Sequence, residues 1–220
     1  MKRQAAVADV AQAASGPLII GIDFDNTIAC YDQAFARVAC AMGLLDEASG
    51  LDKAQVRQRV REQAGEQAWM RLQGLVYGRE IGLASVFPGF DQFVQRARQE
   101  GAVLRIISHK SRYGHFDPEQ VDLRQAAMDW MQQRGFFAPD GLGFVAGDVS
   151  FHDERGEKLA AIARQGCRVF IDDLPEVLLD GAFPPDCRAL WFAPGNRQHP
   201  PLTALPSWAM LSDVLWPAAT

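Results

Sequence analysis

Two aspartates separated by a single residue follow directly on a short apolar stretch near the start of the chain. The stretch is residues 18–22, and the aspartates are Asp23 and Asp25. A β-branched run bounded by polar residues is typical of a buried strand. Two carboxylates at the end of one strand repel each other, so their ionised forms need a compensating positive charge. Hard cations such as Mg²⁺ prefer carboxylate oxygens, and the pair therefore indicates a divalent-cation site.

Polar groups also follow two later predicted strands. Ser108 ends one apolar stretch, and the pair Asp172 and Asp173 follows another. Lys158 lies near the start of the predicted helix that precedes the second of these stretches. In open parallel sheets, ligands bind at the carboxyl ends of the strands. We therefore expect these side chains to meet Asp23 and Asp25 at one edge of a sheet.

Taken in chain order, these residues resemble the four motifs of the haloacid dehalogenase-like (HAD) superfamily, mostly Mg²⁺-dependent phosphoryl-transfer enzymes. The residues that carry the resemblance are Asp23-Phe24-Asp25-Asn26-Thr27, Ser108, Lys158 and Asp172-Asp173. The resemblance extends from about residue 17 to the last predicted helix. It implies an α/β fold, a Rossmann-like three-layer sandwich with a parallel sheet, and a small α-helical cap inserted after the first strand.

The resemblance also implies chemical roles. Asp23 would be the nucleophile that forms an aspartyl-phosphate, and Asp25 would act first as general acid and then as base for the hydrolytic water. Mg²⁺ would be held by a side-chain oxygen of Asp23, the backbone carbonyl of Asp25 and the acidic pair. Within that pair, Asp173 is the better-placed ligand and Asp172 lies behind it. Members of the superfamily that cleave carbon–halogen bonds lack an acid at the position of Asp25, because halide leaves without a proton.

The phosphoryl group would be bound by Ser108, by nearby backbone N–H groups and by the fixed positive charge of Lys158. The expected substrate-binding residues are Thr27, Ser108, His109, Lys110 and Lys158. Lys110 is the alternative to Lys158 as the motif lysine, and the basic loop 109–115 is equally well explained as a solvated surface. Four residues of the insert are further candidates, although aromatic residues at helical spacing more often belong to a core: Trp69, Arg71, Tyr77 and Arg79.

The region between the first motif and Ser108 has a helical pattern. Residues 31–45 show one apolar helical face, and a second pattern begins at Asp52, a typical N-cap residue. Its apolar residues recur every four positions: Val56, Val60, Ala64, Ala68 and Leu72. We therefore divide the chain into a flexible N-terminal tail (1–16), a core (17–31 and 87–220) and a helical cap (32–86).

From residue 88 onwards, predicted helices alternate with predicted strands, which favours a parallel, doubly wound sheet. Glycines 101, 135 and 166 are placed to end three of the helices. The expected helices are 90–99, 123–134, 156–165, 175–179 and 208–216, and the expected strands are 102–108, 142–146, 168–171 and 188–192.

Composition limits the classes of function. The chain has 220 residues, 48% hydrophobic and 22% charged, with a formal net charge of −5 and no basic run, so we expect no nucleic-acid polymer as partner. No segment reaches the roughly 18 apolar residues of a membrane span. The four cysteines have no metal-binding spacing and are expected to be reduced thiols. Residues 1–15 lack the apolar centre of a secretory signal, so we expect a cytoplasmic protein.

The sequence thus predicts a Mg²⁺-dependent phosphomonoester hydrolase that acts on a small phosphorylated metabolite, either a sugar phosphate or a nucleotide. A phosphomutase or phosphotransferase of the same superfamily is the alternative enzyme. A phospho-accepting signalling domain of the receiver type is a more distant alternative, because receivers carry the acceptor aspartate on a later strand and have no helical insert. The physiological substrate and the oligomeric state stay open.

Overall fold

The computed structural model describes residues 16–117, 119–195 and 197–218, so the expected tail lies outside the described residues except for Gly16. Its centre is a six-stranded sheet in the order β5-β4-β1-β6-β7-β8, in which every neighbouring pair is parallel. The strands are β1 (Ile19–Ile22), β4 (Val103–His109), β5 (Val149–His152), β6 (Val169–Asp172), β7 (Arg188–Phe192) and β8 (Ala204–Leu205).

The order of the strands places β1 where the chain changes direction. From β1 the chain builds outward through β4 to β5, and then returns to the other side of β1 to add β6, β7 and β8. Ile22 at the end of β1 is level with Ile106 of β4 and Ile171 of β6. Crevices for ligands form at such switch points, beyond the carboxyl ends of the strands. The topology therefore directs attention to the residues that follow β1.

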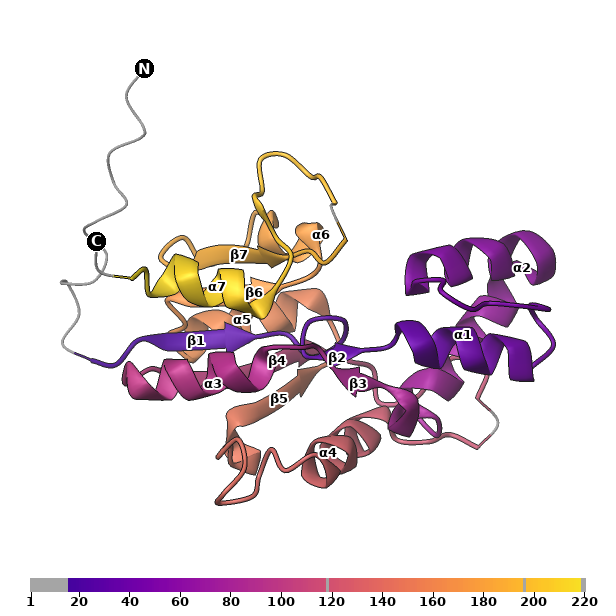
Figure 1. Ribbon diagram of the computed structural model, residues 1–220, viewed down its shortest axis with the longest axis horizontal. Coiled ribbons are helices and arrows are strands. Elements are labelled where there is room, and N and C mark those ends of the chain that lie inside the picture. The colour runs from indigo at the N-terminus through magenta and orange to yellow at the C-terminus, as the bar shows by residue number, and fades with distance from the viewer. Residues whose placement is uncertain (1–15, 118, 196, 219–220) are drawn as a thin grey trace.

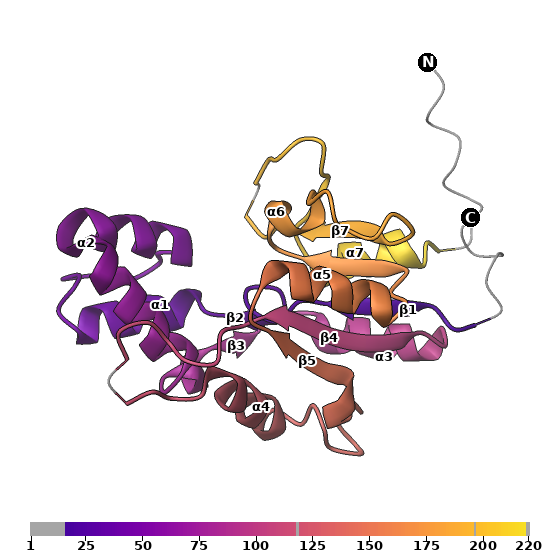
Figure 2. The same cartoon turned by 180° about the vertical axis from the view of Figure 1, so that it is seen from behind.

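Helices cover both faces of the sheet, as Figures 1 and 2 show from opposite sides. On one face, α3 (Phe90–Gln99), α4 (Leu123–Gln133) and α7 (Trp208–Leu215) share a buried apolar cluster with Leu104 and Phe192 of the sheet. On the other face, α5 (Arg155–Arg164) and α6 (Pro175–Leu178) pack on a second cluster that includes Phe170. The expected three-layer α/β sandwich with a parallel sheet is confirmed.

The segment after β1 forms a helical insert that lies beyond the carboxyl end of that strand (Figure 1). It contains α1 (Asp32–Ala41), α2 (Lys53–Tyr77) and a short 3-10 helix (Ile81–Leu83). A two-stranded antiparallel ribbon, β2 (Ala29–Cys30) with β3 (Ser85–Val86), joins the two chain segments at its base. The sequence did not predict this ribbon, because strands of two residues are too short to show a periodic pattern.

The long helix α2 begins as the sequence predicts and then departs from the predicted pattern. The Asp52 side chain accepts a hydrogen bond from the Gln55 N–H, and the Gln55 side chain accepts one from the Asp52 N–H, which completes a capping box. Gly65 has a φ of 83° and interrupts the helix. Val56, Val60 and Leu72 of the predicted apolar face are buried, and Ala68 is half-buried. Of this predicted face, only Ala64, next to the break, is exposed, and Trp69 is a buried residue that the four-residue spacing did not include.

The strand expected at residues 142–146 is wrong. This segment has no strand, and the edge strand of the sheet is β5, a few residues later. Gly143 has a φ of +67°, which no strand residue adopts. Phe144 is buried because it stacks on Phe136, with ring centroids 5.9 Å apart. An apolar cluster in a loop had the composition of a short strand.

Among the residues that the structure describes, we find no helix that combines the length and the apolar character needed to cross a membrane. The longest helix, α2, is 25 residues long but mostly polar.

Candidate active site

Four of the predicted residues meet at the carboxyl edge of the sheet. Asp23 follows β1 and its N–H donates to the Ile171 carbonyl at 2.9 Å, which holds Asp23 in the sheet for one residue more. Ser108 lies near the end of β4, and Asp172 ends β6 with Asp173 next to it. All four residues are at least 95% buried. Parallel strands end at a common edge, and this brings together residues that are up to 150 positions apart in sequence.

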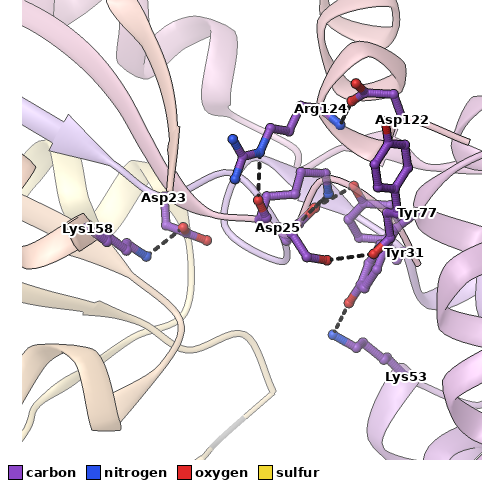
Figure 3. A network of polar contacts seen from close by, with 11 residues as sticks. Asp23, Asp25, Tyr31, Lys53, Tyr77, Asp122, Arg124 and Lys158 are labelled. Carbon is purple, nitrogen blue, oxygen red and sulfur yellow. Dashed lines mark hydrogen bonds and ion pairs between the residues drawn. The ribbon is translucent and has the colours of Figure 1, made fainter. Parts of the chain in front are cut away.

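Lys158 joins this group from α5. Its ammonium donates to Asp23 Oδ1 at 2.7 Å (Figure 3). It also donates to Asp172 Oδ2 at 2.6 Å, and the residue is 1% exposed. Burial alone would lower the pKa of Lys158, but the carboxylates of Asp172 and Asp23 raise it above its ordinary value. The lysine is therefore a permanent cation between two carboxylates.

A single ammonium does not neutralise the three acids beside it. Carboxylate oxygens of Asp23, Asp172 and Asp173 lie within 4.8 Å of one another. Burial, opposed by Lys158 and reinforced by the charge of Asp172, raises the pKa of Asp23 to about 7. Burial and the charges of Asp172 and Asp23 raise the pKa of Asp173 well above its ordinary value. The site therefore has too few positive charges for its carboxylates in the absence of a ligand.

The hydrogen bonds within the acidic pair distinguish its two members. Asp172 accepts from Lys158 on Oδ2 and from the Leu174 N–H on Oδ1, at 2.9 Å, so both of its oxygens are occupied. Asp173 Oδ1 is buried and has no hydrogen-bond partner. A buried polar atom without a partner is unfavourable, and a bound ion or water is one way to satisfy it. Three carboxylates with one orphaned oxygen are a donor set that fits a hard divalent cation such as Mg²⁺.

Two hydroxyl groups near this edge are also buried without a partner. Within the described part of the chain, Ser108 Oγ and Thr27 Oγ1 have no hydrogen-bond partner, and both residues are fully buried. The indole N–H of Trp208, in the core between α3 and α7, is unpartnered as well, so an orphaned atom alone does not define a site. Ser108 differs from Trp208 because it lies at the strand edge with the carboxylates.

Asp25 has a separate set of partners, and the Asp25 side chain is not part of the three-carboxylate cluster. Lys110 donates to both of its oxygens, at 2.9 and 2.8 Å, and the Tyr31 hydroxyl donates to Oδ1 at 2.7 Å (Figure 3). Burial and the charge of Asp25 raise the pKa of Tyr31 well above its ordinary value, so this hydroxyl keeps its proton. The Arg124 Nε–H donates to the Lys110 carbonyl at 2.9 Å and steadies the lysine.

Two expected substrate-binding residues have other partners in the structure. Lys110 is 4% exposed and pairs with Asp25, where the sequence suggested a contact with a substrate anion. His109 is exposed, and its Nε2 donates to the Asp153 carbonyl at 2.8 Å, so the ring turns toward the β5–α5 loop. The basic residues of this loop looked alike in sequence, yet the fold buries one and exposes the other.

The four candidate substrate-binding residues of the insert also lie in different environments. Trp69 is buried and stacks on Phe35 with ring centroids 5.0 Å apart, so it belongs to the core of the insert. Arg71 is exposed, and Arg79 pairs with Glu119 at 2.8 Å. Tyr77 alone faces the site, because the Lys110 ammonium lies 4.8 Å from the centre of its ring.

Sequence reasoning missed Lys53, the first residue of α2. Its ammonium donates to the Tyr77 hydroxyl at 2.7 Å, next to the network around Asp25 (Figure 3). One lysine at the start of a polar helix carries no recognisable spacing to any other functional residue. Only the tertiary structure shows that Lys53 lies near the site, because 24 residues and the break at Gly65 separate Lys53 from its partner Tyr77.

Comparison with known proteins gives a fold relationship. No protein-family model matches the chain, and no curated protein matches it in sequence. Among solved structures, a haloacid dehalogenase-like family hydrolase from Xanthomonas campestris is similar, with a TM-score of 0.51 and 14% identity over 90% of this chain and 94% of the other. CbbY from Rhodobacter sphaeroides, solved in complex with phosphate, is also similar, with a TM-score of 0.50 and 15% identity over 89% and 96%.

Both similarities span nearly the whole of each chain, so they include the insert as well as the sheet. At this level of identity they establish the arrangement of the backbone. The chain has the fold of the haloacid dehalogenase-like hydrolases.

Proposed function

We propose that this protein is a Mg²⁺-dependent phosphomonoester hydrolase that acts through an aspartyl-phosphate on Asp23. The observation that carries the proposal is the set of buried, unpartnered oxygens at this edge: Asp173 Oδ1, Ser108 Oγ and Thr27 Oγ1. A hard cation would satisfy the carboxylate, and phosphoryl oxygens would accept from the hydroxyls. The phosphate bound to the CbbY structure supports this choice of ligand.

Asp23 is suited to nucleophilic attack. Lys158 holds its Oδ1, and no described residue donates a hydrogen bond to its Oδ2. Attack of a carboxylate oxygen on phosphorus forms one P–O bond while the ester P–O bond breaks, and the phosphoryl group stays on Asp23. Lys158 would compensate negative charge as it develops. When bound to Asp23, Asp173 and the Asp25 carbonyl, Mg²⁺ would supply the positive charge that keeps these carboxylates ionised and offsets that of the phosphoryl group.

Asp25 would transfer the protons. In the first half of the reaction it gives a proton to the leaving oxygen, and in the second half it takes one from the water that releases Asp23. Tyr31 and Lys110 hold its carboxylate in one orientation through three hydrogen bonds. A carboxylate that accepts three hydrogen bonds and is held in one orientation suits the second half, in which Asp25 acts as a base.

The test is phosphate release by the purified full-length chain with Mg²⁺ from a broad panel of phosphomonoesters. We expect release that stops on addition of EDTA and falls more than about a thousandfold in Asp23→Asn. Asp140→Asn, which changes an exposed acid, is the matched control and should behave as wild type. Free phosphate also separates a hydrolase from a mutase, which returns the group to a substrate. If the wild-type protein releases no phosphate from any member of the panel, the proposal fails.

A further inference from the structure

The described part of the chain contains three lysines, and all three lie around the candidate active site. Lys158 pairs with Asp23 and Asp172, and Lys110 pairs with Asp25. Lys53 differs, because no carboxylate of a described residue lies within 4.0 Å of its ammonium. Its ammonium donates a hydrogen bond to the Tyr77 hydroxyl. Among the described residues, Lys53 is therefore a cation at the site without a carboxylate in direct contact.

The surroundings of Lys53 hold its ammonium in place. The backbone N–H of Lys53 donates to Asp32 Oδ1 at 2.9 Å, and the side chain is only partly exposed. The ammonium lies 5.5 Å from the centre of the Phe35 ring and 5.4 Å from that of Tyr77. Aromatic faces attract a cation but do not replace hydrogen-bond acceptors. Two of the three ammonium N–H groups remain available to a ligand.

Lys53 is also within electrostatic reach of the reaction centre. Burial lowers its pKa, but the Tyr77 hydroxyl and then the charges of Asp173 and Asp25 raise it above its ordinary value. In Figure 3, Lys53 approaches from the insert, whereas Lys158 approaches from the opposite side, with Asp23 and Asp25 between them. A ligand whose phosphoryl group lies at Asp23 would extend toward Lys53.

We propose that Lys53 binds a second anionic group of the substrate, either a carboxylate or a second phosphate at the end remote from the transferred phosphoryl group. This inference rests on the proposed phosphatase function. The transferred phosphoryl group already has Lys158 and the acidic site for its own charge. The charge of Lys53 is free to compensate another anion, and an anion in this partly desolvated position gains more than it would in water.

A purely structural role for Lys53 makes a different prediction. The bond to Tyr77 joins the start of α2 to its end, so loss of the lysine would loosen the insert. Loosening would weaken catalysis for every substrate alike. Binding of a second anion predicts instead a selective loss, confined to substrates that carry such a group.

The experiment compares three substrates with one carbon skeleton and different remote groups: glycerol phosphate (hydroxyl), phosphoglycerate (carboxylate) and glycerol bisphosphate (second phosphate). Values of kcat/KM are measured for wild type, Lys53→Gln and Lys53→Arg. The matched control is Arg61→Gln, which removes an exposed cation from the same helix. Melting temperatures establish that each variant is folded.

We expect the wild-type protein to prefer at least one anionic substrate over glycerol phosphate, and whichever it prefers identifies the anion as carboxylate or phosphate. In Lys53→Gln this preference should fall by about ten- to a hundredfold, the usual effect of losing one charge-assisted hydrogen bond. Lys53→Arg and Arg61→Gln should keep it.

A wild-type protein without such a preference overturns the inference, and this measurement needs no variant. Equal loss for all three substrates in Lys53→Gln overturns it too. Both results leave the phosphatase function standing. Absence of phosphate release from every phosphomonoester tested refutes the phosphatase function, and the inference falls with it.

Discussion

Replacing Asp23 by asparagine should stabilise the metal-free protein at alkaline pH while it destroys activity. Burial raises the pKa of Asp23 from its ordinary value of 3.8 to about 7 in the folded state. At about 1.36 kcal/mol per pKa unit, this difference corresponds to about 4 kcal/mol of stability that the folded protein loses when Asp23 ionises. Asparagine cannot ionise and avoids that loss.

The substitution also weakens one contact. Lys158 exchanges a charge-assisted hydrogen bond at position 23 for a neutral one, and its 2.6 Å bond to Asp172 remains. The pKa of Asp23 already includes the attraction of Lys158, so the expected net gain at pH 8 stays at about 4 kcal/mol in favour of the variant. The sign follows from the direction of the pKa change. Because the folded protein binds the Asp23 proton more tightly than the unfolded chain does, the contribution of Asp23 to wild-type stability is fully present below pH 3.8 and is lost as the pH rises to about 7.

The assay is urea denaturation of wild type and Asp23→Asn with EDTA, at several pH values between 5 and 8. The advantage of the variant should grow across this range. Added Mg²⁺ should stabilise wild type at pH 8 and have little effect on it at pH 5, because protonated carboxylates are poor ligands. Asp140→Asn should show neither effect. A variant that is less stable than wild type at pH 8, or a difference that does not vary with pH, would refute this account of the acidic site.

Three further substitutions test the surroundings of the site. Lys110→Met should lower kcat by about ten- to a hundredfold with a smaller change in KM, because Asp25 loses two of its three orienting hydrogen bonds. Steady-state kinetics will measure both constants. A change in KM alone would indicate that Lys110 binds substrate instead. Gly114→Ala would place a Cβ 2.6 Å from the Gly74 Cα of α2. We therefore expect urea unfolding to show about 1–3 kcal/mol of destabilisation. An unchanged unfolding midpoint would contradict this contact. Asp52→Ala removes the capping box of α2 and should cost about 0.5–2 kcal/mol, with Asp52→Ser retaining most of the stability.

The residues at the strand ends were predictable from the sequence for a simple physical reason. Parallel strands present their carboxyl ends at one edge, so polar residues that follow apolar stretches must gather there. Asp23, Ser108 and Asp173 meet on this rule alone. Helix boundaries such as the start of α2 at Asp52 were also predictable, because capping is an interaction between residues three positions apart.

Interactions between distant parts of the chain could not be predicted in the same way. The segment 142–146 has the composition of a strand but packs as a loop, because a neighbouring ring and a left-handed glycine decide its path. The break at Gly65 interrupts α2, and Trp69, which the four-residue spacing did not include, is buried after it. Such outcomes depend on which surfaces meet after folding, and periodicity within one segment does not contain that information.

The sequence by itself determined the chemistry at the edge of the sheet: a pair of aspartates, a serine, a lysine and a second acidic pair, in an order that places them together. Only the tertiary structure decided which lysine forms an ion pair with which aspartate. The sequence favoured Lys158 as the motif lysine, with Lys110 as the alternative. In the structure, Lys158 of α5 pairs with Asp23, and Lys110 in the loop after β4 pairs with Asp25. Lys53 reaches the site because α1 and α2 fold over the carboxyl end of β1. Pairing across 85 or 135 residues is set by packing, since side-chain reach is a few ångströms and sequence distance is no guide to it.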